Sequence, residues 1–278
     1  LFARAAGIAP SRGIPRLARR TFTRDWKPRP RPDAPEGRVV LWPDTYNEHL
    51  TPEVSHDAVR VAEAAGFEVV VPGRWVCDGL TWHSTGQLGT ARRVLRWSLG
   101  APELGGDEPV LVLEPSSAAM LRADLPELLP DDPRAARLAR RVVTLAELLD
   151  RVGYAGPPPA AGTATRPAIA QPHCHQQAVL GLEADRRVCE RNGIDVGEEL
   201  VGCCGLAGNF GAELGHEEVS QAVAELSLVP ALEAAPDAPV LADGFSCRTQ
   251  IESLSGRRAR HLAEVLADRL PQEGGTVP

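Results

Sequence analysis

The sequence predicts an α/β protein with two tandem, pseudo-repeated β-α-β-α-β lobes, each with a mainly parallel sheet flanked by helices. Short β-branched runs alternate with longer helical stretches, and this order occurs twice within 278 residues. Several helical stretches also close on a glycine, which is a common helix stop. Strands that alternate with helices pair in parallel, because each helix returns the chain to the same end of the sheet. We therefore expect a tandem duplication with right-handed connections.

The first lobe is expected over residues 37–156. Its strands are rich in valine, and its first two helices end at Gly66 and Gly100. In chain order we expect a strand at 38–42, a helix at 52–66, a strand at 67–73, a helix at 85–100, a strand at 109–115 and one or two helices at 132–153.

The second lobe is expected over residues 168–278 and repeats the same order. Its middle strand leads directly into a pair of adjacent cysteines. In chain order we expect a strand at 168–172, a helix at 176–193, a strand within 194–202, a helix at 217–235, a strand at 238–244 and a helix at 257–270.

Two segments lack this pattern and are interpreted as linkers, residues 1–36 and residues 157–167. The first is basic and proline-rich, and its residues 1–31 hold nine basic side chains against one acid, Asp25. An arginine-rich, acid-poor start is also typical of a transit peptide. Residue 1 is Leu rather than Met. We therefore expect the chain to be a piece of a longer protein.

Composition narrows the class of protein. The net charge of −7 argues against nucleic-acid binding, and 43% hydrophobic residues suffice for a packed core. No apolar run reaches the roughly 18 residues that a membrane span requires. We expect a cytoplasmic protein, or one that lies peripherally at a membrane.

The cysteines carry the strongest functional signal. In so large a chain without a signal peptide a disulfide scaffold is not expected, and adjacent cysteines rarely pair with each other because the ring is strained. Cys174, the pair Cys203–Cys204 and Cys247 each follow a predicted strand, with the spacing C-x28-C-C-x42-C. Open α/β sheets place their sites at these carboxyl ends. We expect three loops to bring four thiols together, for metal binding or redox chemistry.

The first lobe can be laid over the second to test this interpretation. The segment "WPDT" falls on "QPHC", "CDGL" on "CCGL" and "PSSAAML" on "FSCRTQI". The first lobe thus retains one of the four cysteines and is expected to hold a degenerate site. The aligned pairs are Thr45 with Cys174, Cys77 with Cys203, Asp78 with Cys204, and Ser117 with Cys247.

Other interpretations of these residues stay open. The four cysteines are also suited to a zinc ion, to which His173 or His175 would contribute, or to a purely structural role. Each histidine is alternatively a hydrogen-bond donor to a sulfur, a proton shuttle or a solvated loop residue. Cys189 lies within a predicted helix and is expected in the core.

Two first-lobe features are weaker candidates. Cys77, Asp78 and His83 form either a residual metal or redox site or a packing surface against the second lobe. The segment "EPSSAAML" lacks the G-x-S-x-G elbow of a serine nucleophile and is not interpreted as catalytic.

The motifs "CCGLAGNFG" and "ADGFSCRTQI", with the earlier "QPHC", resemble the cysteine-rich CCG domain. That domain occurs in heterodisulfide reductases and in glycolate oxidase iron-sulfur subunits. The resemblance covers residues 38–270 and is closest to the C-terminal part of FAD-linked oxidases of the D-lactate dehydrogenase or glycolate oxidase kind. One departure is Gly244, where the family often has a further cysteine. The resemblance implies that Cys174, Cys203, Cys204 and Cys247 ligate a [4Fe–4S] cluster, with Gly205 and Gly208 in its binding loop.

The resemblance also implies a function. The chain would be the iron–sulfur electron-transfer portion of a flavin-dependent 2-hydroxyacid oxidoreductase, passing electrons from FAD to an unknown acceptor. FAD and a ferredoxin-like domain would lie upstream, because no flavin or nicotinamide fingerprint occurs here. The alternative is a zinc-binding or metal-free module that docks a flavin domain to a partner. A third possibility is thiol–disulfide chemistry at the cysteines.

Overall fold

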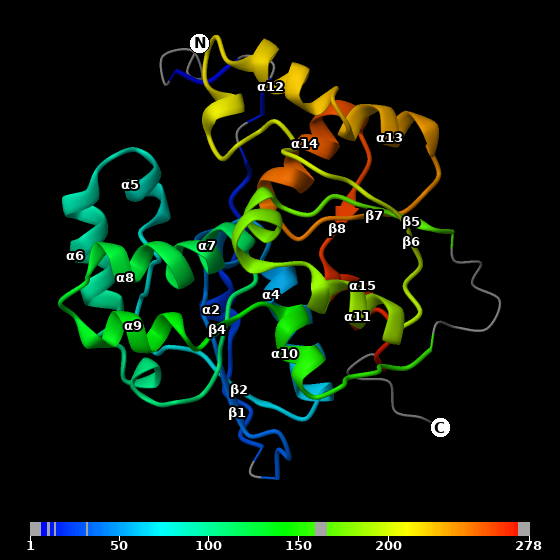
Figure 1. Cartoon of the computed structure of the whole chain (residues 1–278). Coiled ribbons are helices and arrows are strands. Elements are labelled where there is room, and N and C mark those ends of the chain that lie inside the picture. The colour runs from blue at the N-terminus through cyan, green and yellow to red at the C-terminus, as the bar shows by residue number, and fades with distance from the viewer. Residues whose placement is uncertain (1–6, 10–11, 14, 32, 159–165, 272–278) are drawn as a thin grey trace.

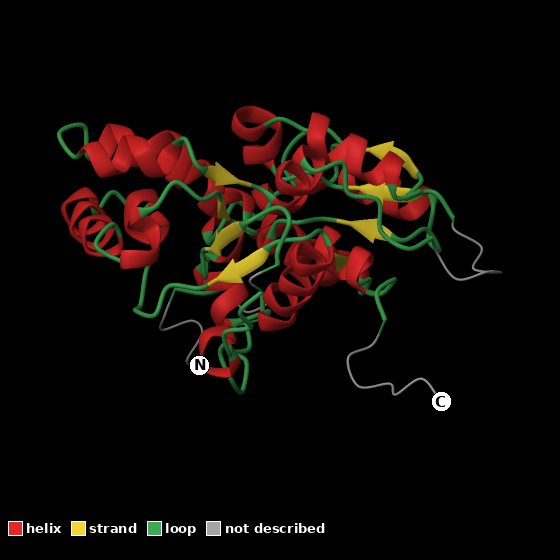
Figure 2. Cartoon of the chain, turned by 90° about the horizontal axis from the view of Figure 1, so that it is seen from below, coloured by secondary structure: helices red, strands yellow, loops and turns green. Residues whose placement is uncertain are grey.

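The computed structural model describes the chain except for residues 1–6, 10–11, 14, 32, 159–165 and 272–278. Two four-stranded sheets, each fully parallel and flanked by helices, form its framework (Figures 1 and 2). This arrangement confirms the predicted α/β class with two lobes. Most of the predicted linker 157–167 lies outside the described residues.

The first sheet has the strand order β2-β1-β3-β4. Its fourth strand was not predicted, because the stretch 132–153 was expected to be helical throughout. The helix is interrupted by two β-branched residues that pair with β3, and a capping box of Thr144 and Glu147 then starts a new helix. The strands are β1 (Arg38–Leu41), β2 (Glu68–Val70), β3 (Val110–Leu111) and β4 (Val142–Val143).

The helices of the first lobe bury small and branched aliphatic side chains against this sheet. Helix α4 and helix α6 confirm two predicted helices within a few residues. The helical elements are α3 (Thr45–His49), α4 (Pro52–Ala64), α5 (Leu80–Ser84), α6 (Leu88–Ser98), η1 (Pro102–Gly105), α7 (Pro115–Ala119), η2 (Met120–Asp124), α8 (Leu125–Leu128), α9 (Pro133–Ala139) and α10 (Leu145–Arg151).

The second sheet repeats the first, with the order β6-β5-β7-β8. Its fourth strand again lies where only a helix was expected, within 257–270. The strands are β5 (Ala168–Ala170), β6 (Val196–Glu199), β7 (Val240–Leu241) and β8 (Ala259–Arg260).

Two predicted helices of the second lobe are each split into two elements. The stretch 176–193 breaks at Gly181, whose φ of 86° ends a π-helical turn. The stretch 217–235 breaks before Ser227. The helical elements are η3 (Gln176–Leu180), α11 (Glu183–Arg191), η4 (Phe210–Ala212), α12 (Glu217–Ala224), α13 (Leu228–Ala234), α14 (Phe245–Ser255) and α15 (Leu262–Ala267).

The two lobes share one hydrophobic core. Helix α15 of the second lobe packs on α4 of the first, and α11 packs on α10 (Figure 1). Cys189 is part of this shared core, as predicted, and Leu262 lies in it beside first-lobe residues such as Leu149. Two further clusters lie mainly within the single lobes, so each sheet also packs against its own helices.

Part of the predicted N-terminal linker packs on the first lobe. Helix α2 (Phe22–Asp25) contacts α3 and α4, and the side chain of Phe22 is fully buried. Within the described residues no helix has the length and apolar character needed to cross a bilayer.

Candidate functional site

The four candidate cysteines meet at the carboxyl edge of the second sheet. Cys174 begins the helical turn after β5, the pair Cys203–Cys204 lies in the loop after β6, and Cys247 is in the first turn of α14 after β7. The thiol of Cys203 is within hydrogen-bonding reach of those of Cys174 and Cys204, and Cys204 reaches Cys247 in turn. The four residues are thus neighbours in this order along one edge, and none of them forms a disulfide. Among the described residues, the group of ligand atoms that all lie within 4.8 Å of one another includes Cys174 but not the other three cysteines.

The hydrogen bonds among these thiols favour one thiolate, at Cys203. Interaction with the neighbouring thiols of Cys174 and Cys204 lowers the pKa of Cys203 well below its ordinary value. The pKa values of Cys174 and Cys204 are raised for the same reason, because each gives a proton to this shared hydrogen bond. A thiolate is the form that binds metals or attacks electrophiles. The site is thus prepared for either chemistry.

Backbone N–H groups of the glycine-rich loop also point at the sulfurs. The N–H of Gly205 donates to Cys203 Sγ at 3.4 Å, and that of Leu206 donates to Cys204. Gly205 has a φ of 94°, and a Cβ there would lie 2.1 Å from the carbonyl oxygen of Ser220. Only glycine fits this position, so the loop and α12 approach as closely as they do because residue 205 has no side chain.

Gly208 contributes in a different way. Its φ is 67°, and a Cβ there would meet no atom within 4 Å. Ala207 beside it has a φ of 47°, the one positive value among described residues other than glycine. Glycine is therefore favoured at position 208 by the left-handed backbone conformation, and not because a side chain would clash.

Two histidines flank Cys174 closely. The rings of His173 and His175 stack with centroids 5.1 Å apart, and their Nδ1 atoms lie 3.8 and 3.9 Å from Cys174 Sγ. The ligand atoms of these three residues all lie within 4.8 Å of one another. Burial lowers the pKa of His173 to about 4 and also lowers that of His175. Both rings are therefore neutral near pH 7 and are available as nitrogen ligands or as partners of the sulfur.

His173 also explains why residue 244 is glycine here. A Cβ at Gly244 would lie 2.4 Å from Cδ2 of the His173 ring. The imidazole thus occupies the space that the side chain of a further cysteine would need. The edge has room either for the His173 ring or for the side chain of a fifth cysteine, and this chain has His173.

The corresponding edge of the first lobe holds the residues that the overlay predicted. Thr45 begins α3, and Ser117 is the third residue of α7, as Cys247 is of α14. Cys77 receives a hydrogen bond from Gly79 N at 3.5 Å, the same contact that Gly205 makes with Cys203. Among the described residues, Cys77, Asp78 and His83 do not form a group with close ligand atoms.

Sequence reasoning missed two buried carboxyl groups at this first edge. Asp44 and Glu114 are each 1% exposed, and burial raises their pKa values to about 6 and about 7. Glu114 Oε2 accepts a hydrogen bond from Phe245 N of the second lobe at 2.8 Å. The overlay gives their positions, because Asp44 aligns with His173 and Glu114 with Gly244, but it does not indicate that they are buried.

The residues present at the second edge fit a cluster of iron and sulfide. The donor set is four free thiols, and the glycine-rich loop directs N–H groups at two of the sulfurs. The absence of a Cβ at Gly205 lets this loop lie against α12. Cys189, by contrast, is buried in the core, and burial raises the pKa of its thiol to about 12.

The fold and the site together define the class: a two-lobed α/β protein with four thiols gathered at one sheet edge. No protein-family model matches the chain. D-2-hydroxyglutarate dehydrogenase of Escherichia coli (strain K12) is 26% identical over 237 residues, which are 83% of this chain and 22% of that protein. The protein of the same name from Pseudomonas putida is 32% identical over 96 residues, 34% of this chain and 9% of that protein.

Lactate utilization protein A of Bacillus thuringiensis (strain Al Hakam) is 25% identical over 250 residues, which are 84% of this chain and 99% of that protein. The chain is thus related to proteins named for 2-hydroxyacid dehydrogenation and for lactate utilization. It spans about a fifth of the Escherichia coli dehydrogenase and nearly the whole length of the lactate utilization protein.

Proposed function

We propose that this chain is the iron–sulfur electron-transfer portion of a flavin-dependent oxidoreductase that acts on a 2-hydroxyacid of the lactate or glycolate type. The observation that carries the proposal is the meeting of four free thiols from three loops at one sheet edge. The names of the relatives support the class of substrate, since they refer to 2-hydroxyglutarate and to lactate. The substrate and FAD would bind outside these residues.

Four residues would hold the cofactor, Cys174, Cys203, Cys204 and Cys247. A [4Fe–4S] cluster supplies one-electron transfer when it is bound. The protein contributes hydrogen bonds and burial. Cys204 and Cys247 are almost fully buried, so these sulfurs are shielded from water on the protein side. The N–H groups of Gly205 and Leu206 partly offset the negative charge that this shielding would otherwise destabilise.

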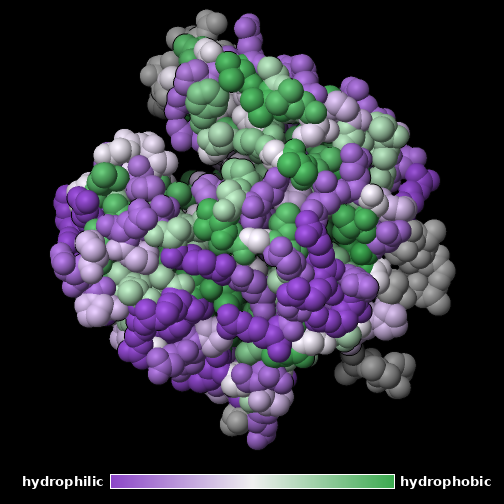
Figure 3. All heavy atoms as spheres, viewed as in Figure 1, coloured by the Kyte–Doolittle hydropathy of each residue, from purple (hydrophilic) through white to green (hydrophobic). Residues whose placement is uncertain are grey.

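The surface beside the cysteine loop suits contact with a partner domain. Apolar side chains gather over α12 and the neighbouring loops in Figure 3. Val201 and Leu226 are 77% and 81% exposed, and Val219 of α12 is also exposed. Exposed apolar groups next to a redox site are suited to a docking surface. An upstream ferredoxin-like or FAD domain, in the same polypeptide or in a partner subunit, would fit this role; the final acceptor is unassigned.

Iron and acid-labile sulfide analysis tests the proposal. Protein purified without oxygen should be brown, should contain about four irons and four sulfides per chain, and should lose its broad visible absorption on reduction with dithionite. A colourless protein without iron would contradict the proposal, whatever its activity.

The close group of His173, Cys174 and His175 favours a second candidate function. Nitrogen and sulfur ligands within 4.8 Å of one another suit a zinc ion. In that case the chain would be a zinc-binding module that docks a flavin domain to its partner. Elemental analysis separates the two functions, because a zinc protein would contain about one zinc per chain and no sulfide.

A further inference from the structure

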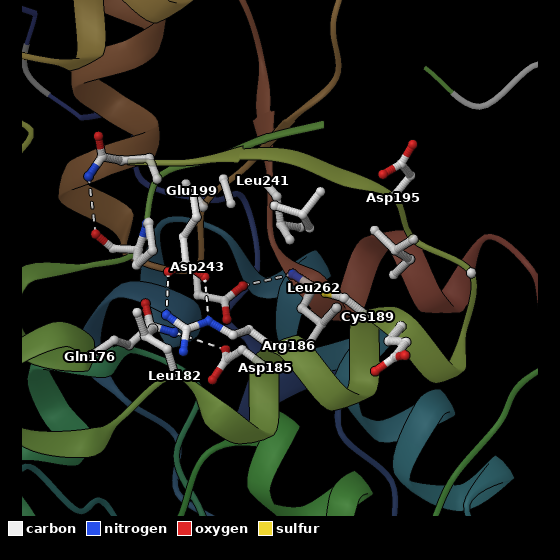
Figure 4. A pocket seen from close by; sticks show the side chains of 18 residues that line it. Gln176, Leu182, Asp185, Arg186, Cys189, Asp195, Glu199, Leu241, Asp243 and Leu262 are labelled. Atoms are coloured by element: carbon white, nitrogen blue, oxygen red, sulfur yellow. Dashed lines mark hydrogen bonds and ion pairs between the residues drawn. The ribbon is translucent and has the colours of Figure 1, made fainter. Parts of the chain in front are cut away.

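A cavity of about 600 Å³ lies in the second lobe, between α11 and the sheet (Figure 4). It opens beside the carboxyl ends of β5 and β7, the neighbouring strands from which the chain leaves in opposite directions. Open α/β sheets commonly bind ligands at such a switch point. Much of the wall is apolar, made by Leu182, Cys189, Ile194, Val196, Leu241 and Leu262.

Four charged side chains gather at one end of this cavity. Figure 4 shows Asp185, Arg186, Glu199 and Asp243 close together there, whereas Asp195 lies at the far end. Arg186 donates two hydrogen bonds to Glu199, at 3.0 and 2.6 Å. The charge of Arg186 is therefore matched by Glu199, and it is the one cationic side chain among the described residues of the wall.

Among the described residues, no arginine or lysine forms an ion pair with Asp185 or Asp243. Each repels the other, and each accepts a hydrogen bond from a neutral group: Gln176 Nε2 at 3.1 Å for Asp185, and Leu262 N at 2.8 Å for Asp243. Burial, with the charge of Asp243 added, raises the pKa of Asp185 well above the ordinary value. A carboxyl group in this state gains most from a positive charge placed beside it.

His261 is near Asp243 but does not supply that charge. Its Nδ1 lies 3.6 Å from Asp243 and accepts a hydrogen bond from Ala263 N, so this nitrogen carries no proton. Burial lowers the pKa of His261, which keeps the ring neutral. Acidic groups thus exceed basic ones throughout the wall, since Glu190 and Asp195 add two more carboxylates.

We propose that this cavity binds an organic cation: a protonated amine carried on an apolar body. The ammonium group would lie between Asp185 and Asp243, where it would neutralise two facing carboxylates. The apolar body would lie against Leu241 and Leu262. Charge complementarity determines the class of ligand. An anion would be repelled by the four or five carboxylates of the wall, and a neutral molecule would not reduce the repulsion between those carboxylates.

Three isosteric probes test the proposal by titration calorimetry on the whole chain at pH 7: 4-phenylbutylamine, 4-phenylbutanol and 4-phenylbutyrate. The amine should bind at least about tenfold more tightly than the alcohol, as expected for a hydrogen-bonded charge pair away from bulk water. The carboxylate should give no binding. Equal affinity for amine and alcohol, preference for the carboxylate, or no heat from the amine would each overturn the proposal. Binding heat does not depend on iron content, so this result is separate from the cofactor assignment.

Two matched variants locate the bound amine. Asp185→Asn should weaken amine binding about tenfold, while Asp195→Asn at the opposite end should change it less than about twofold. Asp185→Asn removes a poorly solvated charge and is expected to fold, which urea titration would verify. Equal effects of the two substitutions, or no effect of Asp185→Asn in the folded variant, would show that the ammonium does not bind at this end and would overturn the proposal.

Discussion

The carboxyl edges of the two sheets have equivalent loops and helices but different side chains. At the second edge the third residue of the helix after the third strand is Cys247, and at the first edge the equivalent residue is Ser117. The loop that places Gly205 N on Cys203 has its counterpart in Gly79 N on Cys77. The duplication has thus kept the loops in both lobes and the full set of thiols in one.

The carboxyl edge of the first sheet contacts the second lobe at Phe245. Glu114 accepts a hydrogen bond from the backbone of Phe245, and Tyr46 stacks on the ring of Phe245 at 5.1 Å. Phe245 is the first residue of the helix that carries Cys247. The first edge therefore contacts the start of the helix that presents Cys247.

The largest difference between the edges is expected from equivalent cysteine substitutions. Cys204→Ser should reduce iron to near zero, since three thiols do not complete the four-cysteine set. Cys77→Ser should leave iron unchanged, because its neighbours Thr45 and Asp78 are not soft ligands. Iron per chain, measured by colorimetry, checks both, with Cys189→Ser as a core control. Loss of iron in Cys77→Ser would show that the first edge holds a working site.

Two glycine substitutions at the second edge should distinguish the cost of a steric clash from the cost of a left-handed backbone conformation. Gly205→Ala places a Cβ 2.1 Å from Ser220 O at a φ of 94°, so it should lower the free energy of unfolding by about 3 kcal/mol. Gly208→Ala meets open space at a φ of 67° and should cost about 1 kcal/mol. Urea denaturation measures both. Equal losses would mean that the contact with α12 is not what requires glycine at 205.

The sequence predicts the cysteine-bearing edge well because its signals are local. Short apolar runs such as "AIAQP" and "APVLADG" predict its central strands, and the overlay of "CDGL" on "CCGL" predicts equivalent loops. The outer strands β4 and β8 were missed, because each is two residues long and lies between helical sequences. Their pairing depends on the neighbouring strand rather than on their own propensity.

The buried carboxyl groups of the first edge could not be predicted, for a different reason. Glu114 and Asp44 are single acids at strand ends, and no pattern around them indicates burial. Their environment arises only when the second lobe packs over the first edge and places Phe245 N against Glu114. The cavity beside Asp185 is likewise a product of packing, formed where α11 covers the sheet.

A pH titration should reveal Glu114, the buried carboxyl group that accepts the hydrogen bond from Phe245. Burial raises the pKa of Glu114 from 4.5 to about 7, an effect that the charge of Asp44 increases and the N–H of Phe245 opposes. The folded protein therefore holds this proton more tightly than the unfolded chain. The contribution of Glu114 to the free energy of unfolding should fall by about 3 kcal/mol as pH rises through this window.

Glu114→Gln should remove that fall. The variant and the wild type should be similarly stable near pH 4.5, and the variant should become relatively more stable toward pH 8 in urea titrations. Asp107→Asn is a suitable control, because Asp107 is exposed and paired with Arg137, which lowers its pKa. Parallel curves for Glu114→Gln and the wild type would mean that Glu114 is not held in a poorly solvated site.

A small effect is expected at the ring contact between the lobes. Tyr46 follows Thr45 as His175 follows Cys174, yet its ring stacks on Phe245 of the other lobe with an interplanar angle of 25°. Tyr46→Leu keeps an apolar side chain and removes the stacking, so it should cost about 1 kcal/mol. A double-mutant cycle with Phe245→Leu measures the coupling. A coupling energy near zero would leave Glu114 as the contact of the first edge that positions α14. A clear coupling would show that both Glu114 and Tyr46 act on the helix of Cys247.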